Sequence, residues 1–110
     1  MNKVELSLVL KNSDKAFYTL EELKREGFNG TVISTESLRH VIEDDPQEHH
    51  FLNLRHIEER ELMQSILVIF IVDEDKLETI KNVIRDYTDN FKAIKGCMYS
   101  RPMSDYEGSI

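Results

Sequence analysis

The sequence has few of the residues on which exported proteins and phosphate-binding loops depend. Its one cysteine, Cys97, excludes an internal disulfide, and a lone thiol is most often a small apolar filler. The four glycines, Gly27, Gly30, Gly96 and Gly108, are too scattered to form a glycine-rich loop around phosphates. The sequence therefore predicts neither a disulfide framework nor a phosphate loop.

Long apolar runs are also missing. The longest, Ile66 to Val72, has seven residues, whereas a membrane-spanning helix needs about 20. Behind Met1, apolar positions alternate with Lys3 and Glu5, which is not the pattern of a secretory leader. We therefore expect a cytoplasmic protein without membrane association.

Positive charge is scarce relative to negative charge. The chain has 14 basic and 21 acidic residues, which gives a net charge of −7. This balance opposes binding to a nucleic-acid polymer, whose phosphates attract clustered Lys and Arg, but it leaves room for a single nucleotide in a local basic pocket. The length of 110 residues predicts one domain, residues 1–110.

What is present in the first third is a strand, a helix and a second strand. Apolar residues alternate with polar ones over residues 3–10, as in a strand covered on one face. Asn12 or Ser13 would cap a helix, and Gly27 would end it with Phe28 packed back on Leu23. The apolar face of this helix is expected to hold Ala16, Phe17, Leu20 and Leu23. The β-branched residues 31–35 form the second strand.

The last third repeats this order. Residues 65–72 are expected to form a central strand buried on both faces. Asp75 and Glu78 match a capping box, which starts a second helix. Its apolar stripe is expected to hold Leu77, Ile80, Val83, Ile84 and Tyr87. Phe91 to Tyr99 is expected to be the last strand, with Gly96 as a bulge or point of close approach, followed by a tail over 100–110.

Two strand-helix-strand units with right-handed crossovers predict a ferredoxin-like α+β sandwich, a four-stranded antiparallel sheet with both helices on one face. The other face has no cover within these units. Val9 and the outward residues of 66–72 would leave it apolar, and large exposed apolar patches mark interfaces. We therefore expect a homo-oligomer.

An insert over residues 36–64 separates the two units, and it is far longer than an ordinary loop. Its residues 36–61 carry all four histidines and eight acidic residues against three arginines, which accounts for five of the seven net negative charges. A divalent metal site is one interpretation, with the candidate ligands Glu48, His49, His50 and His56. A solvated acidic loop is the other, because adjacent histidines point in different directions and no established metal motif is present.

No set of nucleophile, base and acid stands out. Ser34, Thr35 and Ser37 lie near His40 in sequence, but a catalytic triad is recognised by geometry and not by order. We expect a protein without enzymatic activity. Two alternatives stay open: a small ferredoxin-like oxygenase or isomerase with the insert as a lid, and a structural subunit whose acidic insert docks a basic partner.

The order of elements, the Gly27-Phe28 turn, the strand 31–35, the long insert and the segment from Asp75 to Ile80 together resemble PII-like signalling proteins. The resemblance covers residues 3–90, and the position of the insert matches the T-loop of that family. The branch that binds cyclic di-AMP is the most similar in pattern. Glu36 and Ser37 stand where that branch has two glycines, which hinders the approach of the backbone to a phosphate.

The resemblance implies a homotrimer whose sheets surround a central axis, with small effectors in clefts between subunits and the insert reporting occupancy to a partner protein. The expected effector is of the nucleotide type, and the divalent metal suggested by the histidines of the insert is the other candidate. The ligand-binding candidates are Thr35, Ser37 and Arg39 near the insert, and Lys95 and Arg101, which are expected to flank the end of the last strand.

Overall fold

Two strand-helix-strand units make up the part of the chain described by the computed structural model, which covers residues 2–35, 38 and 65–109. The first unit contains β1 (Lys3–Lys11), α1 (Asp14–Arg25) and β2 (Gly30–Thr35). The second contains β3 (Ser65–Asp73), the short 3-10 helix η1 (Glu74–Lys76), α4 (Leu77–Thr88) and β4 (Gly96–Pro102). The predicted order of elements is therefore confirmed.

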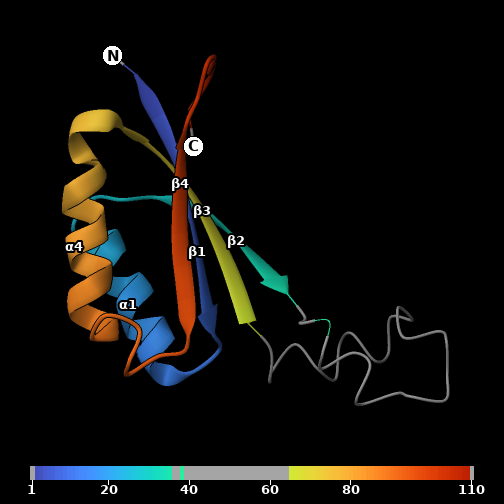
Figure 1. Ribbon diagram of the computed structural model, residues 1–110, viewed down its shortest axis with the longest axis vertical. Helices are drawn as coiled ribbons and strands as arrows, with labels where there is room; N and C mark the ends of the chain where they lie inside the picture. The colour runs from blue at the N-terminus through green and yellow to red at the C-terminus, as the bar shows by residue number, and fades with distance from the viewer. Residues whose placement is uncertain (1, 36–37, 39–64, 110) are drawn as a thin grey trace, which may run out of the picture.

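The strands form one sheet in the order β2-β3-β1-β4, and every neighbouring pair is antiparallel. Both helices lie on the same side of this sheet (Figure 1). This arrangement confirms the ferredoxin-like α+β sandwich. Within the described ranges, no helix has the length and apolar character needed to cross a membrane.

The ends of α1 follow the sequence closely. The Ser13 hydroxyl accepts a hydrogen bond from the Ala16 backbone N–H at 3.1 Å, which caps the first turn. At the other end, Phe28 N–H donates to the Leu23 carbonyl at 2.9 Å and Gly27 N–H donates to the Lys24 carbonyl at 3.0 Å. Gly27 has φ +95°, so the helix closes in the predicted Schellman arrangement.

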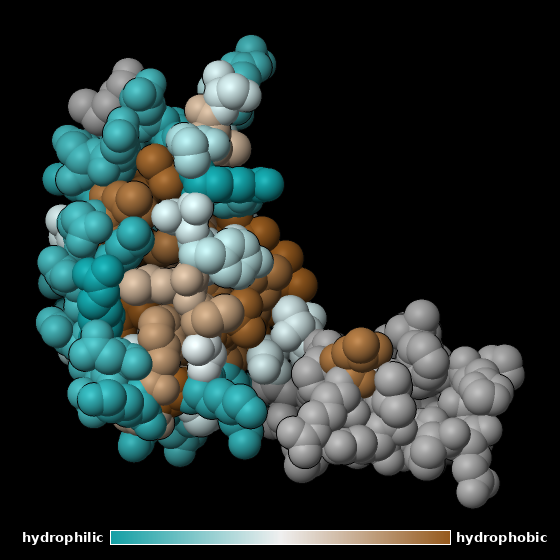
Figure 2. Space-filling model, in the orientation of Figure 1, coloured by the Kyte–Doolittle hydropathy of each residue, from teal (hydrophilic) through white to brown (hydrophobic). Residues whose placement is uncertain are grey.

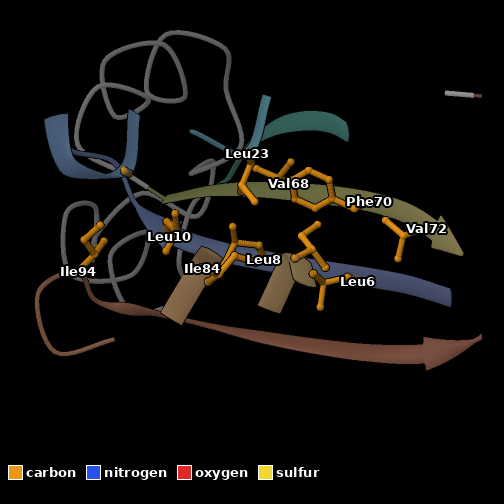
Figure 3. Packing of buried hydrophobic residues seen from close by; sticks show 11 residues of the cluster. Leu6, Leu8, Leu10, Leu23, Val68, Phe70, Val72, Ile84 and Ile94 are labelled. Carbon is orange, nitrogen blue, oxygen red and sulfur yellow. The ribbon is translucent and has the colours of Figure 1, made fainter. Parts of the chain in front are cut away.

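The hydrophobic core lies between the helices and one face of the sheet. Figure 3 shows Leu6, Leu8 and Leu10 of β1 side by side with Val68 and Phe70 of β3. These residues alternate with outward ones because successive side chains of a strand point to opposite faces. We call this helix-packed surface of the sheet the covered face.

Two aromatic residues assigned to the core lie at the surface instead. Phe17 of α1 is 60% exposed and Tyr87 of α4 is 43% exposed. In α1 the buried positions are Ala16, Thr19 and Leu23, which are three and four residues apart. The helix face that packs on the sheet is thus narrower than the helix face formed by apolar residues in the sequence. Phe17 lies at the side of the packed face.

The strand β3 is not buried on both faces. Val68, Phe70 and Val72 are buried, whereas the alternating residues Leu67 and Ile69 are only half-buried. The sequence of β3 does not reveal this alternation, because the residues on both faces of the strand are apolar. The expected double burial is wrong because both helices lie on one side of the sheet.

The second helix begins without the predicted capping box. The 3-10 helix η1 precedes α4, and Lys76 at the N-cap of α4 makes no capping hydrogen bond through its side chain. The residues Asp75 and Glu78 therefore lack the required geometry, since Asp75 lies inside η1.

The last strand starts five residues later than expected. Asp89, Asn90 and Phe91 have φ values of 51°, 55° and 64°, so the chain makes a left-handed turn after α4. The Thr88 hydroxyl holds this turn, because it accepts a hydrogen bond from the Phe91 N–H at 3.1 Å and donates one to the Ile84 carbonyl at 2.7 Å. A strand cannot begin in this left-handed conformation.

Strand β4 runs along one edge of the sheet. A side chain at Gly96 would place its Cβ 2.0 Å from the Val9 carbonyl oxygen, which confirms the expected close approach. Pro102 is tolerated within β4 because an edge strand can leave one N–H position unpaired. The tail therefore begins at Met103, whose N–H donates to the Lys3 carbonyl at 3.0 Å.

Candidate functional site

The sheet surface that faces away from the helices carries rows of apolar side chains, and we call it the open face. Residues paired across antiparallel strands point to the same side, so the register defines each row. Two adjacent rows run across β2, β3, β1 and β4 in that order: Ile33, Leu67, Val9 and Cys97, and then Thr31, Ile69, Ser7 and Tyr99.

Much of this surface remains accessible in the single chain. Ile33 is 42% exposed and Tyr99 is 59% exposed, while Leu67 and Ile69 are half-buried. Figure 2 shows apolar side chains gathered over the sheet on the side away from the helices. An apolar surface of this extent is typical of an interface with another protein chain.

One end of the open face is charged. Arg101 Nε lies 2.6 Å from Glu5 Oε1, and Lys3 Nζ lies 2.7 Å from Asp73 Oδ1. The hydrogen bond with Asp73 raises the pKa of Lys3, and the same bond lowers the pKa of Asp73. Lys3 also lies over the Tyr106 ring, with Nζ 5.8 Å from its centre. Ion pairs and the C-terminal segment thus form the border of the apolar rows at this end.

The opposite end of the sheet is where the insert leaves and returns. Thr35 Oγ1 donates to the Ser65 carbonyl at 3.0 Å, so the threonine hydroxyl fixes the two ends of the insert to each other. Lys11 pairs with Ser65 in the register, and its N–H donates to the Lys95 carbonyl at 2.9 Å. Thr35, Lys11 and Lys95 therefore share this end of the sheet.

Thr35 and Lys95 lie at opposite edges of that end. β2 and β4 are the two edge strands, so three strand spacings, or about 14 Å, separate these residues within one chain. Contact of a single phosphate with both side chains of one subunit would require them to be much closer.

The expectation that Lys95 and Arg101 flank the same end of the last strand is wrong. Lys95 precedes the first residue of β4, and Arg101 is its penultimate residue. Six residues of extended chain span about 20 Å. Arg101 is moreover paired with Glu5, so part of its charge is already balanced.

The other candidate residues lie outside the described ranges. They comprise Ser37 and Arg39 among the ligand-binding candidates, and Glu48, His49, His50 and His56 among the metal ligands. Within residues 2–35, 38 and 65–109, no group of three or more His, Cys, Asp or Glu side chains is placed to hold a metal ion.

Glu5 and Lys11 are the residues that the sequence interpretation missed. Glu5 has the same parity in β1 as Val9, which signals the open face, but its partner Arg101 follows only from the β1–β4 register. Lys11 is the last residue of β1, and only the β1–β3 pairing places it beside the ends of the insert.

Comparison with solved structures gives the fold a precedent. CPII from Thiomonas intermedia K12, bound to ADP, AMP and acetate, has a TM-score of 0.58 and 18% identity, over 93% of this chain and 86% of that chain. This chain therefore shares its fold with CPII. CPII is described as a nitrogen regulatory PII-like protein, and its structure bound to ADP, AMP and bicarbonate has a TM-score of 0.58 at 15% identity, over 94% of this chain and 87% of that chain.

A further structure with a similar fold is that of a functionally unknown protein from Pediococcus pentosaceus ATCC 25745. Its TM-score is 0.59 at 9% identity, over 99% of this chain and 100% of that chain. No family model and no curated protein matches the sequence. Similarity at these identities shows the shared fold alone, and the chemistry of the site depends on this chain's own residues.

Proposed function

We propose that this protein is a non-enzymatic PII-like regulator that assembles as a homotrimer and binds a small nucleotide-type effector in clefts between subunits. The observation that carries the proposal is the open face, an apolar sheet surface on a PII-like fold. In this proposal the 36–64 insert reports effector occupancy to a protein partner, and one state of the insert binds the effector more tightly than the other.

In a trimer, Thr35 and Lys95 from different subunits could contact the same effector, which the two residues of one chain are too far apart to do. In a ring of three sheets that face one axis, the β2 edge of each subunit adjoins the β4 edge of the next. Thr35 is the last residue of β2 and Lys95 comes just before β4, so both lie at the end of the sheet where the insert leaves and returns. Assembly would therefore bring the hydroxyl of one subunit toward the ammonium of another.

The chemistry of these groups favours a phosphate-bearing effector. The Lys11 and Lys95 side chains supply positive charge at this end of the sheet, and Thr35 supplies a hydroxyl. The similar CPII structures are described with ADP and AMP bound, which supports adenine nucleotides as the first compounds to test. The small-enzyme alternative, with the insert as a lid, concerns residues outside the described ranges.

Light scattering and a thermal-shift series with ADP, AMP, cyclic di-AMP and divalent metals test the proposal together. We expect a mass three times that of one chain and a melting temperature that rises with one nucleotide. A ligand at 100 times its Kd stabilises the folded state by about 2.7 kcal/mol. A monomer at micromolar concentration would contradict the assembly, and no response to any nucleotide would contradict the effector class.

Substitutions at the two ends of β4 locate the effector. Lys95→Ala should reduce the thermal shift, because it removes positive charge beside the insert. Arg101→Ala is the matched control, because it removes the same charge about 20 Å away, at the other end of the strand. A larger loss in Arg101→Ala would place the effector at the charged end of the open face and refute the site beside the insert.

A further inference from the structure

A hollow of about 540 Å³ is lined by residues of α1, of α4 and of the turn that follows α4. Figure 1 shows both helices on the side of the sheet opposite the open face. The helices α1 and α4 run antiparallel, so the first turn of α1 lies beside the last turn of α4. The hollow is lined by Lys15, Tyr18, Asp86, Tyr87, Asp89 and Ala93. The proposed trimer would cover the sheet and leave this hollow accessible.

Tyr18 and Tyr87 both line the hollow, and each has a neighbouring side chain close to it. Tyr18 is 57% exposed, and the Phe17 ring packs edge-on against it with the ring centres 6.0 Å apart. The Glu22 carboxylate beside the Tyr87 hydroxyl raises the pKa of Tyr87.

The charges around the hollow favour a cation. The carboxylates of Asp86 and Asp89 have no ion-pair or hydrogen-bond partner within the described part of the chain. Lys15 contributes one positive charge, so the lining is negative on balance. Tyrosine faces attract cations as well, and a planar guanidinium both stacks on such rings and pairs with a carboxylate through two hydrogen bonds.

We propose that this hollow is a docking surface for a protein partner that inserts an arginine side chain between Tyr18 and Tyr87. The guanidinium stacks on the rings while Asp86 and Asp89 balance its charge. Lys15 lies on the same rim and weakens the attraction, which sets a limit on affinity. The inference does not depend on the effector or the trimer, because it uses only the helix layer.

The probe is the peptide acetyl-Ala-Arg-Ala-amide, titrated into the full-length protein labelled with ¹⁵N and followed by NMR. The matched control peptide carries citrulline, which keeps the planar shape of arginine and lacks its charge. We expect amide shifts confined to the first turn of α1 and the segment from Asp86 to Ala93. Affinity for the citrulline peptide should be at least about fivefold lower. Equal affinities, or shifts spread over the whole acidic surface, would overturn the proposal.

Protein variants separate a specific site from general attraction to an acidic protein. Asp86→Asn with Asp89→Asn should weaken arginine-peptide binding at least about fivefold. Asp105→Asn with Glu107→Gln removes the same charge from the C-terminal segment, where Tyr106 contacts Lys3, and should leave binding unchanged. Lys15→Gln should strengthen binding. Equal losses in both double variants, or weaker binding in Lys15→Gln, would show that the hollow is not the site.

Discussion

The two faces of the sheet are built from the same kinds of apolar residue, yet they differ in how far these residues are buried. On the covered face, Leu6 and Leu8 are fully buried beneath the helices. On the open face, Ile69 is half-buried and Ile33 is 42% exposed in the single chain. Hydrophobicity alone therefore does not distinguish the surface that stabilises the fold from the surface available to another subunit.

The comparison indicates a division of roles between neighbouring residues of one strand. Residues on the covered face contribute to the free energy of unfolding of each chain, because their side chains leave water when the helices pack. Residues on the open face leave water only when a partner covers them. Substitutions on the two faces should therefore change different measured quantities.

The largest expected effect is on the covered face. Leu8→Ala removes a fully buried side chain from the centre of β1, where the neighbours cannot fill the space. Such a substitution typically lowers the free energy of unfolding by about 2–5 kcal/mol. Urea denaturation of the wild type and the variant measures this loss. A loss below about 1 kcal/mol would mean that the core can rearrange around this position.

A substitution on the open face should alter assembly more than folding. Ile69→Lys places a charge in the middle of the apolar rows, so it should reduce the mass measured by light scattering to that of a monomer while the circular dichroism spectrum is retained. Thr79→Lys, on the exposed surface of α4, is the control and should keep the assembled mass. If Ile69→Lys keeps that mass too, then the open face is not the assembly surface.

The smallest effect concerns the ion pair between Lys3 and Asp73 at the charged end of the open face. The lowered pKa of Asp73 means that its contribution to stability is present above the ordinary value of 3.8 and is lost as the pH falls through the lowered one. The raised pKa of Lys3 means that its contribution is present below 10.5 and is lost as the pH rises through the raised value. The contribution is thus complete between these limits.

Melting temperatures of the wild type and Lys3→Gln at pH 7 and in acid measure this contribution. The variant should melt slightly below the wild type at pH 7, since exposed ion pairs stabilise proteins only weakly. The difference should shrink as Asp73 becomes protonated. Lys92→Gln, an exposed lysine in the turn before β4, serves as the charge control. An unchanged difference in acid would show that the ion pair is not its source.

Much of the fold could be predicted because it depends on local patterns. The alternation over residues 3–10 fixed the buried side of β1, and Gly27 with Phe28 predicted the end of α1. The position of β4 could not be predicted in this way. Its start depends on three successive left-handed residues and on hydrogen bonds of Thr88, and none of these follows from the apolar pattern of 91–99.

The candidate site was less predictable than the fold. The sequence places Lys95 and Arg101 near the last strand, but their separation depends on where β4 begins. The shift of that start by five residues moved them from one end of the strand to opposite ends. Phe17 and Tyr87 were assigned to the core for a related reason. The apolar pattern of a helix does not show how wide a face of that helix becomes buried.

The sequence by itself determined the order of the elements, the closure of α1 and the apolar character of both sheet faces. These features depend on neighbouring residues and on the two-residue period of a strand. Only the tertiary structure decided that Glu5 meets Arg101, that Thr35 and Lys95 lie at opposite edges, and that two tyrosines flank a hollow between the helices. Strand register and helix packing join residues far apart in the chain, and local periodicity carries no information about those pairings.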